Sequence, residues 1–284
     1  MLHSLNRLRS SCQSQPNSLR LTLFRWSLMA MLALGLTLFG GNGTSPNCAR
    51  AETPETAPDQ LKNALQQIDA AANSRNLQGV LQFYGKNFKG ADGLTRQSLS
   101  TALSEFWKRF QTLSYRTDLQ SWTTEGNAIV AETVTYITGT QRLDGRKLDL
   151  SATLRSRQRY EGGKIVQQEI LTEHNQLSSG QNPPTLEIKL PETVRVGQQF
   201  NFDAIVQEPL GDDLLLGAAV EESVGVDGYV KATPIELELL PAGGIFKLGR
   251  APYTEDNHWI SAVILRGDGL SAITQRLQVR KQNR

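Results

Sequence analysis

The sequence predicts an α+β domain followed by an all-β domain, and three observations lead to this prediction. Apolar residues recur at a helical period between about residues 59 and 110, and at a period of two between about 113 and 175. Beyond residue 185 the chain holds only short apolar runs separated by Pro and Gly. The polar stretch 176–184, QLSSGQNPP, separates the two patterns and predicts a linker.

Residues 1–51 have the composition of a secretory signal peptide. They contain five arginines and no acidic residue, an apolar stretch at 26–40, and the small-x-small triplet ARA at 49–51. The apolar stretch is shorter than the roughly 20 residues that span a bilayer as a helix. We expect cleavage after Ala51, with an uncleaved membrane anchor as the alternative. Either outcome exports the rest of the chain, to the bacterial periplasm or cell envelope.

The composition of the remaining 233 residues excludes several functions. Both cysteines lie in 1–51, and Ser45-Pro46-Asn47 before Cys48 does not match the Leu-small-small pattern of lipid attachment. The mature chain therefore has no disulfide and no thiol nucleophile. It keeps 25 basic and 28 acidic side chains, a net charge of −3 instead of +2. This mild negative charge argues against a nucleic-acid partner.

The first domain is expected at 59–175, after a polar leader at 52–58. Helices are predicted near 61–72, 77–84 (capped by Asn76) and 95–110 (capped by Thr95). Turn signals at Glu125-Gly126, Asp144-Gly145 and Gly162-Gly163 then separate four predicted strands, at 113–122, 127–140, 147–160 and 164–175. This order predicts three helices on one face of a curved antiparallel sheet.

The stretch LKNALQQIDAAANSRNLQGVLQFYGKNFKG, followed by ALSEFWKRF and long hairpin strands, resembles the NTF2-like superfamily, which includes SnoaL-like and ketosteroid-isomerase-like proteins. The resemblance covers 59–175. It implies a cone with a ligand pocket between helices and sheet, and it raises the prospect of a homodimer formed through the sheet.

The second domain, 185–281, is expected to be a β-sandwich. Its seven strand-like runs are TLEIKL, QFNFDAIVQ, LLLGAAVEE, IELELL, GIFKLG, WISAVIL and SAITQRLQV. Their number and spacing resemble an immunoglobulin-like sandwich.

The tight turns define a strand register for the first domain. With two-residue loops, Tyr160 faces Ile165, Gln158 faces Gln167, Ser156 faces Glu169 and Leu154 faces Leu171; Ile137 faces Ala152, Thr133 faces Ser156 and Glu132 faces Arg157. The register of the first strand stays open, and Tyr115, Leu119 and Trp122 are not placed.

This register sorts the polar side chains onto two faces. The apolar face under the helices also carries polar groups, which either line a pocket or meet water at an open rim. With aromatic residues nearby, the pocket candidates are Tyr84, Trp107, Thr133, Ser156, Gln158, Gln167, Glu169 and Glu173. The opposite face carries Glu132, Arg155, Arg157 and Arg159, which fit a solvated face, a dimer interface or a seat for the second domain.

No residue pattern identifies a catalytic centre. His174 and His258 have no metal-ligand spacing, and no cofactor is implied. A ketosteroid-isomerase-like lyase or isomerase would need Glu169 or Glu173 as base with Tyr84 or Tyr160, but no motif of that family is matched. We therefore expect an exported, non-catalytic binding or assembly protein whose pocket takes a small apolar or amphipathic ligand, with that enzyme as the alternative.

Overall fold

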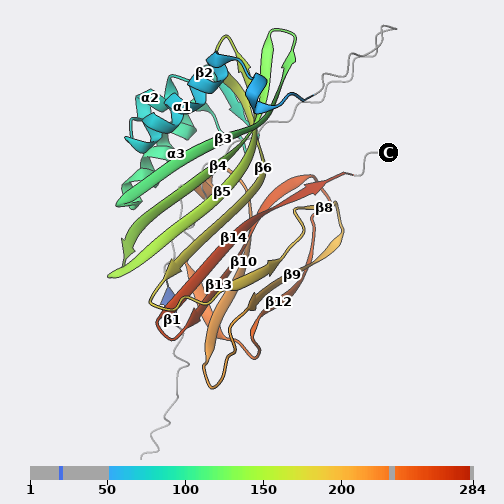
Figure 1. Ribbon diagram of the computed structural model, residues 1–284. Helices are drawn as coiled ribbons and strands as arrows, with labels where there is room; N and C mark the ends of the chain where they lie inside the picture. The colour runs from blue at the N-terminus through green and yellow to red at the C-terminus, as the bar shows by residue number, and fades with distance from the viewer. Residues whose placement is uncertain (1–18, 22–50, 230–233, 282–284) are drawn as a thin grey trace, which may run out of the picture.

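The computed structural model describes residues 19–21, 51–229 and 234–281 (Figure 1). The predicted signal peptide and its cleavage site therefore lie outside the described residues, apart from 19–21 and Ala51. Residues Leu19–Leu21 form a short strand, β1, which pairs with β11 (Ile235–Leu239). None of the helices in the described ranges is both long and apolar enough to cross a membrane.

The first part of the chain packs helices against an antiparallel sheet. The helices are α1 (Asp59–Asn73), α2 (Leu77–Leu81) and α3 (Arg96–Arg109), and the long strands are β3 (Thr112–Glu125), β4 (Ala128–Leu143), β5 (Arg146–Glu161) and β6 (Lys164–Ser179). The Asn76 side chain accepts a hydrogen bond from the Gly79 amide, and Thr95 exchanges hydrogen bonds with Ser98 in a capping box. Both predicted caps are confirmed.

The segment after α2 differs from the prediction. The second helix was expected to reach Tyr84, but α2 ends at Leu81, and Tyr84–Gly90 forms strand β2. Strand β2 runs parallel to β6, with Tyr84 opposite Ile165. Tyr84 is thereby held beside the sheet, and its ring meets Phe88 edge to face at 5.0 Å.

The predicted register is correct between β4 and β5, where Thr133 faces Ser156, Ile137 faces Ala152 and Glu132 faces Arg157. Between β5 and β6 only Tyr160–Ile165 is confirmed. Register shifts at Arg159/Tyr160 and Arg155/Ser156 each add a residue to β6, so that Gln158 faces Gln168, Ser156 faces Ile170 and Leu154 faces Glu173. The predicted partners Gln167, Glu169 and Leu171 are wrong, because each bulge turns the following side chains to the other face.

The second part of the chain is built from strands, with one in each of the seven predicted runs. They are β7 (Leu186–Lys189), β9 (Gln199–Val206), β10 (Leu215–Ser223), β11, β12 (Gly244–Arg250), β13 (Asp256–Arg266) and β14 (Gly269–Arg280). A short additional strand, β8 (Thr193–Arg195), pairs with β14. Strands β12, β9 and β7 form a small sheet, and residues such as Phe202 and Ile264 form a buried core between the two sheets.

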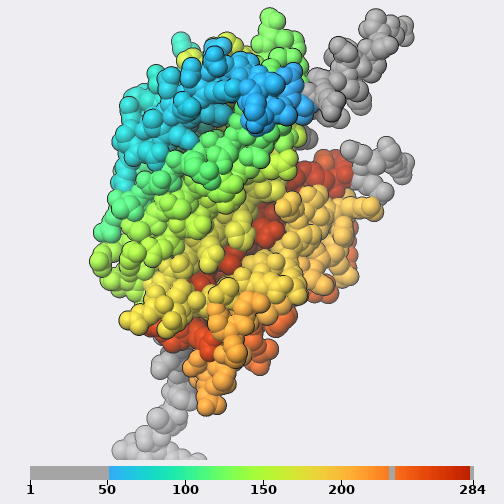
Figure 2. Space-filling view, viewed as in Figure 1, coloured from blue at the N-terminus to red at the C-terminus, as the bar shows by residue number. Residues whose placement is uncertain are grey.

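The two parts share one continuous sheet. Strand β14 pairs with β6 from Leu270–Ser179 to Gln275–His174, which gives the strand order β1-β11-β10-β13-β14-β6-β5-β4-β3. Residues 176–179, expected in a linker, are therefore the end of a strand. Figure 1 shows the helices on the upper part of this sheet and the small sheet over its lower part, and the space-filling view in Figure 2 shows the two parts in contact along β6 and β14. The chain is thus an α+β protein with mostly antiparallel strands and few helices.

Candidate functional site

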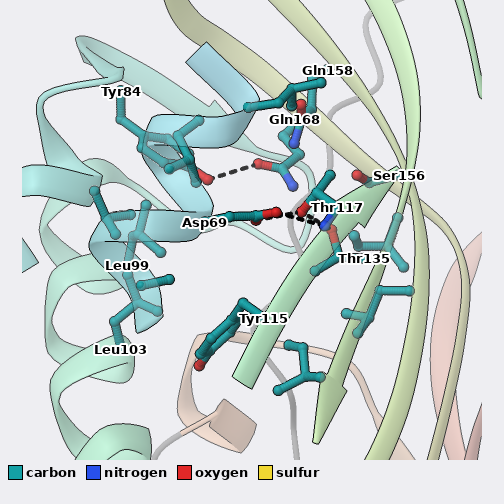
Figure 3. A pocket seen from close by; sticks show the side chains of 17 residues that line it. Asp69, Tyr84, Leu99, Leu103, Tyr115, Thr117, Thr135, Ser156, Gln158 and Gln168 are labelled. Carbon is teal, nitrogen blue, oxygen red and sulfur yellow. Dashed lines mark hydrogen bonds between the residues drawn. The ribbon is translucent and has the colours of Figure 1, made fainter. Parts of the chain in front are cut away.

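A cavity of about 100 Å³ lies between helices α1 and α3 and the sheet (Figure 3). Its apolar lining includes Leu65, Ile68, Val80, Leu99, Leu103 and Ile170, and its polar lining includes Asp69, Tyr84, Thr117, Ser156, Gln158 and Gln168. Drug-sized ligands occupy pockets of roughly 300–1,000 Å³, whereas a cavity of about 150 Å³ holds one benzene. The space therefore fits a small ring or a few waters, but not a steroid.

Asp69 brings a carboxyl group from α1 to the cavity. Its Oδ2 accepts a hydrogen bond from the Thr117 amide (2.6 Å), and its Oδ1 accepts one from Thr117 Oγ1 (2.7 Å). One turn further along α1, the Asn73 side chain bonds both main-chain groups of Tyr115. Burial raises the pKa of Asp69 above its ordinary value, although the hydrogen bonds from Thr117 oppose this shift.

Tyr84, Gln158 and Gln168 form another wall of the cavity, and Tyr160 lies behind it, bonded to Gln158. Tyr84 Oη donates to Gln168 Oε1 (3.2 Å), and Tyr160 Oη donates to Gln158 Oε1 (2.6 Å). The two glutamines are direct partners across β5 and β6. Burial raises the pKa of both tyrosines far above neutrality, so both hydroxyls stay protonated and remain donors.

The cavity contains three of the eight predicted pocket residues: Tyr84, Ser156 and Gln158. Thr133 is buried beside it, with its hydroxyl 3.0 Å from that of Ser156. Trp107 also lies outside the lining and donates through Nε1 to the Tyr115 hydroxyl (2.9 Å).

Gln167 and Glu169 point away from the cavity. The first β6 bulge turns them to the outer face, where Gln167 is exposed and Glu169 Oε2 lies 3.4 Å from Arg157 Nη1. Burial raises the pKa of Glu169, while the charge of Arg157 acts to lower it. Neither residue can contact a ligand in the cavity.

Glu173 belongs to a fully buried polar network between the two parts of the chain. Its Oε2 accepts hydrogen bonds from Arg276 Nε (3.1 Å), Arg276 Nη2 (2.9 Å) and Trp259 Nε1 (2.9 Å). Arg276 also binds Asp92 through both terminal nitrogens, at 3.1 and 3.0 Å. Tyr229 Oη donates to Asp92 Oδ2 at 2.5 Å. Because Asp92 and Glu173 come from the first part and the other members from the second, the network joins them.

The charges of this network are unequal, since two carboxyl groups face one guanidinium. Burial by itself lowers the pKa of Arg276, but the charges of Asp92 and Glu173 outweigh burial and raise it, so the guanidinium stays charged. Burial raises the pKa of Glu173, with Arg276 opposing. Glu173 is enclosed and fully bonded, so it holds the structure together and does not face a ligand.

The four interface candidates pair with one another or with nearby carboxylates. Glu132 binds Arg155 and Arg157, both at 2.7 Å, and Arg159 binds Glu125 and Glu161. Burial acts to raise the pKa of Glu132, but the two arginines outweigh it, and the pKa is lowered. These pairs satisfy the charged face within one chain, and a dimer through it stays a prediction.

Two histidines, His174 and His258, lie within the described residues. His174 is exposed on β6, whereas the His258 ring nitrogens lie 3.0 Å from Glu221 and 3.2 Å from Asp256. Over the described ranges, no cluster of three or more His, Cys, Asp or Glu side chains could hold a metal ion.

Sequence reasoning missed several cavity residues. Asp69 carries a signal that could have been used, because it stands within the apolar stripe of α1, four residues after Leu65 and three before Ala72. Thr117 belongs to the strand whose register was left open. Gln168 was placed on the wrong face by a bulge that leaves no local signal.

A family model described as "Domain of unknown function (DUF8623)" matches residues 181–280. The search of the curated proteins found no match. Among solved structures, Bdellovibrio bacteriovorus Bd1075 is 15% identical with a TM-score of 0.29, covering 39% of each chain. An M. tuberculosis LEH-like epoxide hydrolase is 13% identical with a TM-score of 0.28, covering 41% of this chain and 84% of that one. Likenesses this weak carry no functional argument, and the chain spans only about two fifths of Bd1075.

Proposed function

We propose that this chain is an exported protein that binds a small molecule, without transforming it, in the cavity under α1 and α3. The observation that carries the proposal is the cavity lining, which sets apolar side chains from the helices beside hydrogen-bonding groups such as Asp69 and Gln168. A site of this kind holds the apolar body of a ligand and orients its polar end. The volume of about 100 Å³ restricts the ligand to a compact molecule.

In this proposal residues 59–175 form an NTF2-like cone, and residues 185–281 form an immunoglobulin-like domain that presents an interaction surface. The order of helices and strands and the cavity between them support the first assignment. The packing of two sheets over one buried core supports the second. The composition of residues 1–51 supports export to the periplasm or cell envelope.

The geometry favours binding over catalysis. The enzymatic alternative requires a pocket glutamate as base, but Glu169 lies on the outer face and Glu173 is enclosed with Arg276. Among the described residues that line the cavity, Asp69 alone has a carboxyl group, and Thr117 holds that group in place through a hydrogen bond to each oxygen. This leaves recognition as the role best supported by the side chains present.

A titration with cyclopentanone, followed by ligand-observed NMR, tests the proposal. We expect wild-type protein to bind the ketone, and we expect the ketone to remain chemically unchanged after prolonged incubation. Leu103→Trp should abolish binding because the larger side chain fills the cavity. Leu214→Trp, the same change at a position that is 72% exposed, should bind like wild type. Equal binding by both variants would place the ligand elsewhere, and chemical conversion of the ketone would refute the non-catalytic role.

A further inference from the structure

The side-chain amides of Gln158 and Gln168 line the cavity, and each Nε2 atom carries two N–H donors. Each amide uses its oxygen to accept a tyrosine hydroxyl, from Tyr160 and Tyr84 respectively. Both side chains line the cavity and are only 7% and 8% exposed. Within the described part of the chain, neither Nε2 atom has a hydrogen-bond partner.

Over the described residues, neither Nε2 atom is among the fully buried atoms without a partner, so both are accessible from the cavity. Water satisfies them there until a ligand takes its place. A ligand that displaces this water without offering an acceptor loses affinity, so the two amides favour a ligand that carries one. Although a hydroxyl that donates can also accept, the tyrosine hydroxyls among the described residues accept no hydrogen bond from either amide nitrogen. A ligand oxygen placed between the two glutamines would accept one N–H from each of them.

An acceptor lies on the neighbouring side of the cavity. Figure 3 shows the Gln168 amide between the Tyr84 hydroxyl and the Asp69–Thr117 pair. Each Asp69 oxygen accepts one hydrogen bond from Thr117, and a carboxylate oxygen can accept a second. A ligand N–H or O–H beside the bound oxygen could therefore donate to Asp69.

The charge of the lining argues against an ionic ligand. Among the described residues that line the cavity, none is Lys, Arg or His. A ligand carboxylate would meet Asp69 without a counter-charge, and a compact cation would leave the two amide donors unpaired. The arrangement therefore selects an uncharged molecule.

We propose that the cavity recognises a compact, uncharged ligand in which a carbonyl oxygen adjoins an N–H group, namely a small lactam or carboxamide. The carbonyl oxygen accepts from Gln158 and Gln168, the N–H donates to Asp69, and the carbon skeleton contacts the leucines of α1 and α3. This inference rests on the proposed function and specifies the ligand class for the same cavity.

Three five-membered rings of similar size test the ligand class: 2-pyrrolidinone, cyclopentanone and cyclopentane. We expect affinity to fall in that order, because the second ring lacks the N–H and the third lacks both polar groups. Gln168→Met removes one of the two side-chain amides. It should weaken the binding of 2-pyrrolidinone and of cyclopentanone by about three- to tenfold and leave the binding of cyclopentane unchanged. Gln167→Met, the same change at the exposed neighbouring position, should have no effect.

The outcomes separate this inference from the proposed function. Equal affinity for the three rings, or tighter binding of propionate than of 2-pyrrolidinone, would overturn the ligand class while small-molecule binding stands. Binding of none of the probes to a protein that is also recovered without a ligand would overturn both. If Gln168→Met fails to fold by circular dichroism, Gln158→Met and the order of affinities in wild type decide the question.

Discussion

Replacing Arg276 by methionine should destabilise the protein more than any surface substitution. The change removes the guanidinium that binds Asp92 and Glu173, whose side chains are 1% and 0% exposed. Breaking a buried ion pair from one side typically costs about 3–5 kcal/mol, because the remaining charge stays buried without a partner. Since two carboxyl groups lose their partner here, we expect a loss of about 5 kcal/mol. That is a large fraction of the roughly 5–15 kcal/mol that stabilises a protein domain.

Urea unfolding measures this loss. With an unfolding slope of about 1–3 kcal/mol per molar urea, the midpoint should fall by more than about 1 M. Arg159→Met is the matched control, because Arg159 pairs with Glu125 and Glu161 at the surface and should contribute less than about 1 kcal/mol. Adding Asp92→Asn and Glu173→Gln to Arg276→Met should recover part of the loss. Equal midpoints for the two arginine variants would show that the buried network does not stabilise the fold.

Three further predictions concern other parts of the protein. Trp259→Phe removes the indole donor to Glu173 and should lower the free energy of unfolding by about 1–3 kcal/mol, measured in urea. The raised pKa of Asp69 favours its protonated form in the folded state. Wild type should therefore gain stability relative to Asp69→Asn as the pH falls from neutrality towards the ordinary aspartate pKa. A constant difference in urea midpoint across this range would contradict the raised pKa of the Asp69 carboxyl group. Gly180→Ala should lower the free energy of unfolding by more than about 2 kcal/mol, because φ is +93° and a Cβ would lie 2.5 Å from a main-chain oxygen of the β13–β14 turn. Gly126→Ala, at φ +61° with open space around it, should lower it by about 1 kcal/mol. Equal losses in the two variants would show that the close contact at Gly180 does not affect stability.

Features that depend on neighbouring residues could be predicted from the sequence. The caps at Asn76 and Thr95 are local hydrogen bonds, and Asn and Thr are residue types that commonly cap helices, so the sequence predicts them. The turn at Asp144-Gly145 sets the register of β4 and β5, so the contacts of Thr133 and Glu132 followed from it. The α+β class and the strands of the second part rest on the same kind of local pattern.

The rest of the cavity could not be predicted, because it depends on irregular pairing. A bulge is a response of one strand to its partner, and the sequence of β6 does not mark the two positions where it occurs. One inserted residue places Gln168 at the cavity instead of Gln167 and turns Glu169 outward. This single residue removed two of the eight predicted pocket residues, Gln167 and Glu169, from the cavity.

The buried network was beyond sequence reasoning for a different reason. Asp92 and Arg276 are 184 residues apart, and no local pattern connects them. The pairing of β6 with β14, which brings the two parts together, likewise joins Ser179 to Leu270 across the expected linker. Polar residues at such positions look like ordinary surface residues until the topology is known.

Native mass spectrometry of the protein isolated from its own cells tests the central claim most directly. We expect the mass of a chain that begins at Glu52, together with the mass of a small neutral ligand. The ligand should be released intact on denaturation and should be absent from the Leu103→Trp variant. A wild-type protein that carries no adduct, and that gains none when incubated with 2-pyrrolidinone or cyclopentanone, would contradict small-molecule binding in this cavity.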